Sequence, residues 1–254
     1  MSEENPVLLE RADGVARVTL NRPAQRNAVD LPTCIALRGI FEQLDGDDAV
    51  RAVLIAGAGP LFCAGADLKE RDGRDMEWVR RRRLAAFATY DAIERCSKPV
   101  VALVHGAAIG SGGEIALAAD FVIAEEDAYF QFPEPKWGTV GATQRLQRAI
   151  GLRSAKELLL TGRKLDAQEA QMRGLVARLA PKGGLEAAGH KAAGAIVAAP
   201  ALAIRLTKQA MDLGSRTDLA NGIRIELAAI DHNLSTDEWR SGQDKFLKQN
   251  KSDH

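Results

Sequence analysis

The 254-residue chain is long enough for one large domain, or for one domain with a small appendage. Its hydrophobic content of 46% is sufficient for a buried core, which excludes an intrinsically disordered chain. Thirty-four basic residues balance 34 acidic ones, so no net charge favours nucleic acid or a membrane surface as a partner.

The sequence shows no sign of targeting, membrane insertion or metal binding. The N-terminus is polar and acidic, and the longest apolar runs are far below the ~20 residues that span a bilayer. Cys34, Cys63 and Cys96 lie far apart without metal-ligand spacing, and the 4 histidines are scattered. We therefore expect a cytoplasmic protein that neither enters a membrane nor binds a metal.

The first quarter of the chain follows the order β, β, α, β. Residues 7–9 and 15–20 are predicted strands on either side of a turn at Asp13-Gly14. Asp30 is placed to cap a helix whose apolar positions, at helical spacing, are Leu37, Ile40, Phe41 and Leu44. A buried strand is predicted at 52–56, and the glycines that follow end it.

The next segment combines small residues with charge. Small side chains at 64–66 let backbone N–H groups approach a ligand closely. The charged run that follows peaks in four consecutive arginines at 80–83 and merges into a predicted helix carrying Leu84, Phe87 and Ile93. The simplest interpretation of the four arginines is a solvated helix face.

The central segment consists of a strand at 99–104, a glycine-rich turn at 105–114 and a short apolar helix. Backbone N–H groups at the start of that helix would point at an oxygen that carries negative charge. Glu114 would lie in its first turn, where burial raises the pKa of a carboxyl group. This arrangement suits stabilisation of an enolate. On this segment alone, an ordinary strand-to-helix crossover with a favourable first-turn acid remains the alternative.

The second half is mostly helical after strands at 121–124 and near 128–130. Ser154 with Glu157 and Asp166 with Glu169 have capping-box spacing, and Gly174 precedes a strand-like segment at 175–177. Two apolar stripes at helical spacing follow and are predicted to form core or subunit contacts: residues 202, 206, 210 and 213, and residues 219, 223, 227, 230 and 234. The pattern predicts an α/β layered core with a C-terminal helical appendage.

Several motifs occur in a specific order: Asn21-Arg22-Pro23 with Asn27-Ala28, residues 62–70, residues 106–119, Pro133-Glu134, residues 143–146, residues 160–163 and residues 174–176. In this order and spacing the chain resembles the crotonase (enoyl-CoA hydratase/isomerase) superfamily over essentially its whole length. Residues 62–71 and the segment 218–227 look most like the methylglutaconyl-CoA hydratase branch.

The resemblance implies a crotonase-like spiral of ββα units. Residues 1–195 would form that core with the coenzyme A site and the active site, and residues 196–254 a helical trimerisation region. It also implies a homo-trimer, or a hexamer built as a dimer of trimers. The partner would be an acyl-CoA thioester, so coenzyme A enters as part of the substrate and no separate cofactor is needed.

The same resemblance assigns site residues. The backbone N–H groups of Ala66 and Ser111 would hold the thioester oxygen. Glu114 would activate water and Glu134 would supply the proton to Cα, as hydration of an enoyl thioester requires. The alternative for Glu134 is a structural loop acid between two prolines. The positions that match coenzyme A contacts are Lys69, Arg26, Ala28, Ala64, Asp67, Gly110, Phe246 and Lys248.

One departure from the family pattern concerns the loop at 135–142, which is about three residues shorter than in relatives and includes the bulky Trp137. Its shortness predicts a shifted Glu134 or a reshaped acyl pocket. Two other readings stay open: isomerase, hydrolase or decarboxylase chemistry at the same site, and an RNA-binding or non-catalytic acyl-CoA-binding protein. The RNA reading depends on the arginine run, and the balanced charge argues against nucleic acid.

Overall fold

The computed structural model describes the backbone of residues 5–252 and, within helix α10, only part of its side chains. The main sheet has six strands in the order β1-β2-β3-β4-β6-β9. The strands are β1 (Val7–Ala12), β2 (Val15–Leu20), β3 (Ala52–Gly57), β4 (Val100–Val104), β6 (Phe121–Glu125) and β9 (Arg178–Ala180). Within this described sheet only β1 and β2 pair antiparallel, through a turn in which Asp13 and Gly14 both have positive φ.

A second, three-stranded sheet supports the site. It contains β5 (Ala107–Ile109), β7 (Tyr129–Gln131) and β8 (Lys164–Asp166), in that order. Strands β5 and β7 each lead into a segment of the site, because α3 (Ser111–Ala118) follows β5 and the 3-10 turn η3 (Glu134–Trp137) follows β7. Since β5 and β7 are parallel neighbours, the segments after them begin at the same edge.

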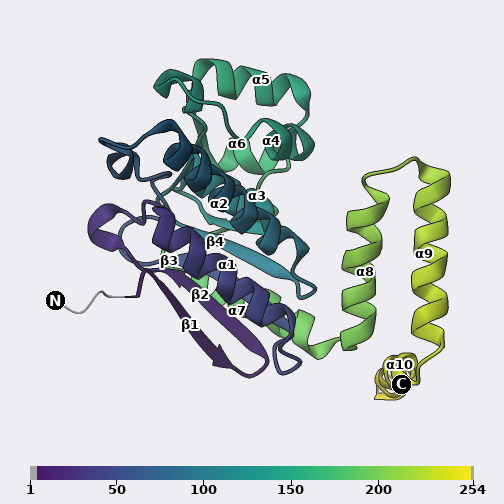
Figure 1. Cartoon of the computed structure of the whole chain (residues 1–254). Coiled ribbons are helices and arrows are strands. Elements are labelled where there is room, and N and C mark those ends of the chain that lie inside the picture. The colour runs from purple at the N-terminus through teal and green to yellow at the C-terminus, as the bar shows by residue number, and fades with distance from the viewer. Residues whose placement is uncertain (1–4, 253–254) are drawn as a thin grey trace.

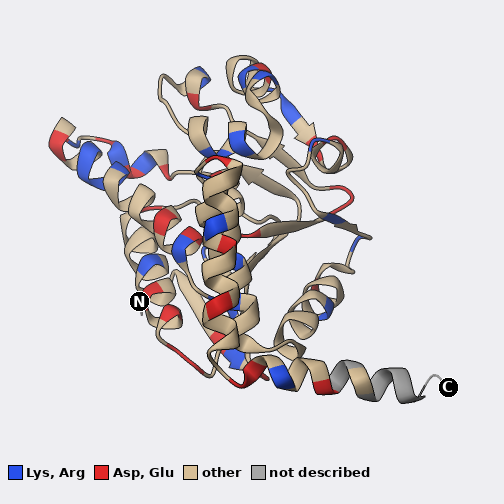
Figure 2. Cartoon of the chain, turned by 90° about the vertical axis from the view of Figure 1, so that its right-hand side faces the viewer, with Lys and Arg blue, Asp and Glu red and all other residues tan. Residues whose placement is uncertain are grey.

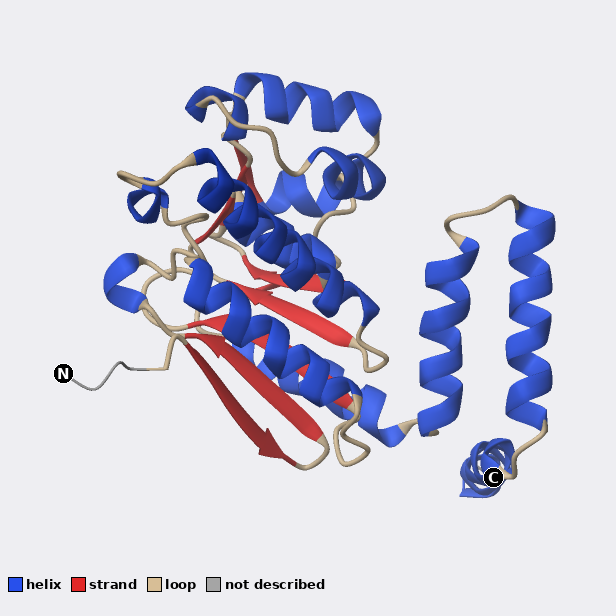
Figure 3. Cartoon of the chain, in the orientation of Figure 1, coloured by secondary structure: helices blue, strands red, loops and turns tan. Residues whose placement is uncertain are grey.

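Helices cover both faces of the main sheet (Figures 1 and 3). On one face lie α1 (Leu31–Asp45) and α2 (Met76–Arg95), which pack on each other and on the larger core. On the other, α7 (Leu185–Ala198) contacts β3, β4 and β6. The inner strands are therefore buried on both sides, which explains why β3 and β4 are continuous apolar runs.

The remaining core elements are short. They are the turns η1 (Pro23–Gln25) and η2 (Leu68–Arg71) and the helices α4 (Thr143–Ile150), α5 (Leu152–Thr161) and α6 (Ala167–Met172). The three helices lie together at the top of Figure 1, and α6 contacts β7 and β8 of the smaller sheet. Acidic and basic residues are intermixed along the chain in Figure 2, in keeping with its zero net charge.

The C-terminal helices stand apart from the core. Helices α8 (Ala201–Gly214) and α9 (Leu219–Leu234) form a hairpin beside it, and α10 (Glu238–Ser252) follows (Figure 1). The predicted stripe on α9 is exposed along its length, at Leu219, Ile223, Leu227, Ile230 and Leu234. Residue 195, our predicted domain boundary, falls inside α7, which continues to Ala198.

No single helix in the described part of the chain is both long and apolar enough to cross a bilayer. Helices α7 and α8 meet the length and composition criteria only as a pair, bent by 108°.

The local predictions met mixed outcomes. Asp30 and Asp166 cap their helices as predicted, each accepting a backbone N–H three residues on, at 2.8 and 2.7 Å. Ser154 was wrong as a cap, because α5 begins after Gly151 and contains it. The strand predicted at 175–177 instead occupies residues 178–180, and β5 was not predicted.

Candidate active site

The two glycine-rich segments of the sequence lie side by side. Cys63 and Ala108 form a parallel β-bridge, in which the Ile109 N–H donates to the Cys63 carbonyl at 2.9 Å. Ala66 and Ser111 each lie three residues beyond this bridge, and a Cβ on Gly65 would be 3.9 Å from the Ser111 nitrogen. Gly65 is required between them, since it has φ +103° and a Cβ there would lie 2.9 Å from the Ile109 carbonyl oxygen.

The backbone amides of Ala66 and Ser111 are free donors. Ser111 is the first residue of α3, so its N–H has no acceptor within the helix. Across residues 5–252 neither amide donates a hydrogen bond, and both residues line the same cavity. Two free N–H groups side by side can bind an oxygen that gains negative charge.

Glu114 lies one turn into α3, and only 4% of its surface is exposed. Its Oε1 accepts the Ala142 N–H at 2.6 Å, and its Oε2 pairs with Arg145 at 3.4 Å. Burial raises the pKa of Glu114, while the Ala142 N–H and the Arg145 guanidinium act in the opposite direction. The negative charge of the buried Glu114 carboxylate is therefore stabilised by one backbone N–H and one guanidinium group.

Glu134 opens η3 and is 9% exposed. It lies against two glycines: a Cβ on Gly110 would be 3.3 Å from Oε1, and one on Gly141 would be 3.0 Å from Cγ. Among the described residues its buried Oε2 has no hydrogen-bond partner. Burial raises the pKa of Glu134, and the charge of Glu114 raises it further.

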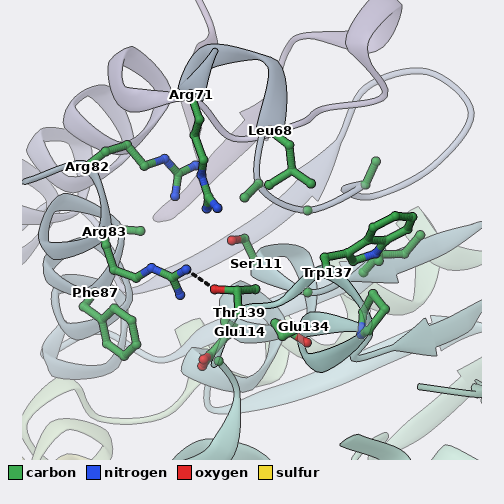
Figure 4. Close-up of a pocket in the computed structure, with 18 of the residues that line it drawn as sticks. Leu68, Arg71, Arg82, Arg83, Phe87, Ser111, Glu114, Glu134, Trp137 and Thr139 are labelled. Carbon is green, nitrogen blue, oxygen red and sulfur yellow. Dashed lines mark hydrogen bonds between the residues drawn. The ribbon is translucent and has the colours of Figure 1, made fainter. Parts of the chain in front are cut away.

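The short loop at 135–142 touches both carboxyl groups. Gly141 packs on Glu134 and the next residue, Ala142, donates to Glu114. Trp137 is 69% exposed and lines the rim of the cavity. Figure 4 shows Glu114, Glu134 and Ser111 around one space, with Trp137 at its edge.

The positions that match coenzyme A contacts fall on neighbouring segments. The Ala64 N–H donates to the Arg26 carbonyl at 3.0 Å, and Ala28 lies two residues further on. Asp67 caps η2, accepting the Lys69 N–H at 3.2 Å, and also pairs with an arginine of the 21–23 motif. Arg26 and Lys69 are exposed, whereas Ala64 and Gly110 line the cavity. Phe246 and Lys248 lie outside the residues whose side chains are described.

The arginine run is not the solvated face that we predicted. Arg80 and Arg81 are exposed, but Arg82 is 2% exposed, pairs with Glu70 and donates to the Val29 carbonyl. Arg83 points toward the cavity and donates to Thr139 (dashed in Figure 4). With two of four arginines turned inward, the run does not form a continuous cationic surface.

Sequence reasoning also missed Tyr90 and Arg145. Tyr90 lines the cavity, and burial raises its pKa. Arg145 belongs to a recognised motif but had no assigned role; it binds both Glu114 and Glu94. Helix α2 begins after its cap at Asp75, and Arg82, Ala86 and Tyr90 lie four residues apart on its buried face. This spacing is the signal in the sequence that indicates their burial.

Neither an ionised thiol nor a cluster of metal-binding side chains is found among the described residues of the site. Burial raises the pKa of Cys63, next to the bridge, to about 12, so its thiol is not ionised at neutral pH. Across residues 5–252 no group of three or more His, Cys, Asp or Glu side chains is arranged to hold a metal.

Comparison with known proteins adds independent evidence. The family model described as "Enoyl-CoA hydratase/isomerase" matches residues 10–254. "Probable enoyl-CoA hydratase 2, mitochondrial" from Arabidopsis thaliana is 36% identical over 94% of this chain and 80% of its own length. "Crotonyl-CoA hydratase" from Syntrophomonas wolfei is 34% identical over 99% of this chain and 98% of its own. The crystal structure of enoyl-CoA hydratase from Bacillus anthracis superimposes with a TM-score of 0.93 at 36% identity, over 96% of both chains.

Proposed function

The chain belongs to the enoyl-CoA hydratase/isomerase family, and from this premise we propose that it is an enoyl-CoA hydratase acting on a short or branched enoyl thioester. One observation carries the proposal: two buried carboxyl groups and two free amides face a single cavity. Addition of water to an α,β-unsaturated thioester needs a base for the water, an acid for Cα and donors for the enolate oxygen.

The amides of Ala66 and Ser111 meet the third requirement. As water attacks Cβ, electron density moves to the thioester oxygen, where these donors stabilise it. Removing one such donor typically costs about 2.7–4 kcal/mol of transition-state stabilisation. The parallel bridge between Cys63 and Ala108, three residues before each donor, supports this assignment.

The surroundings of the two glutamates support different roles. Glu114 has the Ala142 N–H and the Arg145 guanidinium, which favour its ionised form, so it is the base that activates water. Glu134 has a buried oxygen without a partner, which favours its protonated form, so it supplies the proton to Cα. In dehydration the two roles are exchanged.

We also propose how the substrate and further copies of the chain are arranged. Lys69, Arg26, Ala28, Ala64, Asp67 and Gly110 would contact coenzyme A, supported by their positions on adjoining loops. Phe246 and Lys248 would approach a neighbouring subunit's coenzyme A. The exposed apolar side chains of α9 support a homo-trimer or hexamer built through residues 196–254. Three buried free cysteines support a cytoplasmic location.

The direct test is the loss of enoyl-thioester absorbance with crotonyl-CoA and 3-methylglutaconyl-CoA, with mass analysis of the product. A hydratase adds the mass of one water, and the preferred substrate assigns the branch. An isomerase would leave the mass unchanged, and one that relies on Glu134 alone would survive Glu114→Gln. A hydrolase would instead release the coenzyme A thiol, and a decarboxylase carbon dioxide; either result would overturn the proposal.

A further inference from the structure

A chain of four charged side chains runs from the candidate active site to the turn of the C-terminal hairpin. Glu114 Oε2 pairs with Arg145 at 3.4 Å, and Arg145 pairs with Glu94 Oε2 at 2.8 Å. The other carboxylate oxygen of Glu94, Oε1, accepts a hydrogen bond from Arg216 at 2.9 Å. Each side chain therefore contacts the next, in the order Glu114, Arg145, Glu94 and Arg216.

The members of this chain come from separate parts of the fold. Glu114 lies on α3, Arg145 on α4 and Glu94 near the end of α2, whereas Arg216 lies in the turn between α8 and α9. Arg216 follows Glu94 by 122 positions, so it is the docking of the hairpin beside the core that brings them together. The chain thus connects an element outside the cavity to the proposed base.

Glu94 limits how much Arg145 stabilises the Glu114 anion. Arg145 donates to Glu94 from Nε and Nη2, at 3.0 and 2.8 Å, but donates to Glu114 only from Nη1, at 3.4 Å. The guanidinium is therefore bound more closely by Glu94, whose negative charge also raises the pKa of Glu114. Arg216 offsets part of the Glu94 charge and so leaves more of the positive charge of Arg145 for Glu114.

The exposure of the side chains sets the size of this effect. Arg216 and Glu94 are 53% and 35% exposed, whereas Arg145 and Glu114 are 20% and 6% exposed. Water and salt screen the outer pair strongly and the inner pair much less. A change at Arg216 should therefore reach Glu114 through the two groups between them, with a modest magnitude.

The other charged groups beside the outer pair do not replace Arg216. On α8, Lys208 pairs with Asp120 at 2.7 Å. Asp212, also on α8, is half-buried, and the charge of Glu94 contributes to its raised pKa. Among the described residues, Glu94 has ion pairs only with Arg145 and Arg216.

Nor do the groups on the cavity side of Glu114 supply a second cation. Tyr90 and Glu134 face it, and burial raises the pKa of both, so both carry no charge in the proposed active form. Arg82 of α2 pairs with Glu70, and its neighbour Arg83 donates to the Val140 carbonyl at 2.7 Å.

We propose that Arg216 is a positioning residue for the reaction: through Glu94 and Arg145 it helps to keep Glu114 ionised, so that the C-terminal hairpin contributes to the catalytic base. The proposal rests on the proposed function only in taking Glu114 as that base. Arg216 itself does not contact the substrate.

The test is the pH profile of kcat/KM for crotonyl-CoA hydration in two variants that should shift it in opposite directions. Glu94→Gln removes the charge that competes for Arg145, so the acidic limb should move to lower pH by about 0.5 unit. Arg216→Met leaves Glu94 with Arg145 alone, so the limb should move to higher pH by about 0.3 unit. Arg216→Lys should restore most of the wild-type profile. A purely structural role would lower the rate at every pH without moving the limb.

A double variant tests the route, and a matched variant serves as control. In the Glu94→Gln background, Arg216→Met should hardly move the limb, because its partner no longer carries a charge. The control is Arg224→Met, an exposed arginine of the same hairpin that bonds to Asn221 among the described residues. Its profile should match that of the wild type.

Three results would overturn the proposal: shifts of the same sign in both single variants, a limb that Arg216→Met leaves in place, or an Arg216→Met shift that persists in full beside Glu94→Gln. A carboxyl NMR titration with isotope-labelled glutamate, assigned by the signal lost in Glu114→Gln, follows the ionisation of Glu114 without turnover. No hydration together with both shifts in the titration would contradict the proposed function but support the coupling. Hydration without these shifts would overturn the coupling alone.

Discussion

Replacing Arg145 with methionine should make Glu114 a poorer base at neutral pH. Arg145 lies 3.4 Å from Glu114 Oε2, and the two side chains are 20% and 6% exposed. Unit charges about 4 Å apart interact by about 4 kcal/mol at an effective dielectric constant of about 20. Because Glu94 shares the same guanidinium at 2.8 Å, we expect about a third of this, which is roughly 1.4 kcal/mol or one pKa unit.

The sign follows from which form the arginine stabilises. Arg145 favours ionised Glu114, so its loss raises the pKa of Glu114 above its already raised value. Since the base must be ionised, the acidic limb of the pH profile of kcat/KM should move to higher pH by about one unit. At a fixed pH below that limb, the rate should fall about tenfold.

The assay is crotonyl-CoA hydration followed by absorbance across the pH range. Arg148→Met is the matched control, because Arg148 lies on the same helix and bonds only to Gln144 among the described residues. Its pH profile should match the wild type. An equal loss of rate at every pH in Arg145→Met, with the limb unmoved, would refute the electrostatic role of Arg145.

Three further predictions concern stability. Glu134→Gln should stabilise the fold against chemical denaturation near neutral pH. The pKa of Glu134 is raised in the folded state, so the wild type loses stability as pH rises from about 4.5 through the folded-state pKa. The loss is about 1.4 kcal/mol for each pH unit between the unfolded-state and folded-state pKa values. If the extra stability of Glu134→Gln persists at low pH, where Glu134 is protonated in both states, the predicted pH dependence is wrong. Gly113→Ala should destabilise the fold by about 1–3 kcal/mol, because the added Cβ would lie 2.5 Å from the Phe132 ring. Gly194→Ala, in open space on α7, should instead stabilise it by about 0.5–1 kcal/mol. Equal shifts in the melting temperature of the two variants would refute the packing argument. Arg82→Met should cost about 3 kcal/mol in chemical denaturation, because it removes the buried partner of the half-buried Glu70 carboxylate and its bond to the Val29 carbonyl. An unchanged denaturation midpoint would show that the ion pair contributes nothing.

The predictions that succeeded from sequence rest on local chemistry. Asp30 and Asp166 cap helices because an acidic side chain reaches a backbone N–H only three residues away. The free N–H of Ser111 likewise follows from its place as the first residue of a helix. Such features can be predicted from the sequence because every partner lies within a few positions in the chain.

The features that sequence did not predict depend on distant partners. Strand β5 has only three residues and exists because residues 129–131 pair with it. The burial of Arg82 is set by Glu70 and by the carbonyl of Val29, which lies 53 positions away. The family resemblance pointed to both glutamates, but only the packed structure shows that Glu114 pairs with Arg145. It also shows that the buried Oε2 of Glu134 has no hydrogen-bond partner among the described residues.

Glu114 and Glu134 are proposed to act as one unit on a single water and a single proton. The most direct test is a cycle of kcat/KM for crotonyl-CoA hydration in the wild type, Glu114→Gln, Glu134→Gln and the double variant. If the two carboxyl groups act together, each single change should remove nearly as much activity as both changes combined. Losses that multiply in the double variant, or a single variant with near-wild-type turnover, would contradict a two-glutamate hydratase.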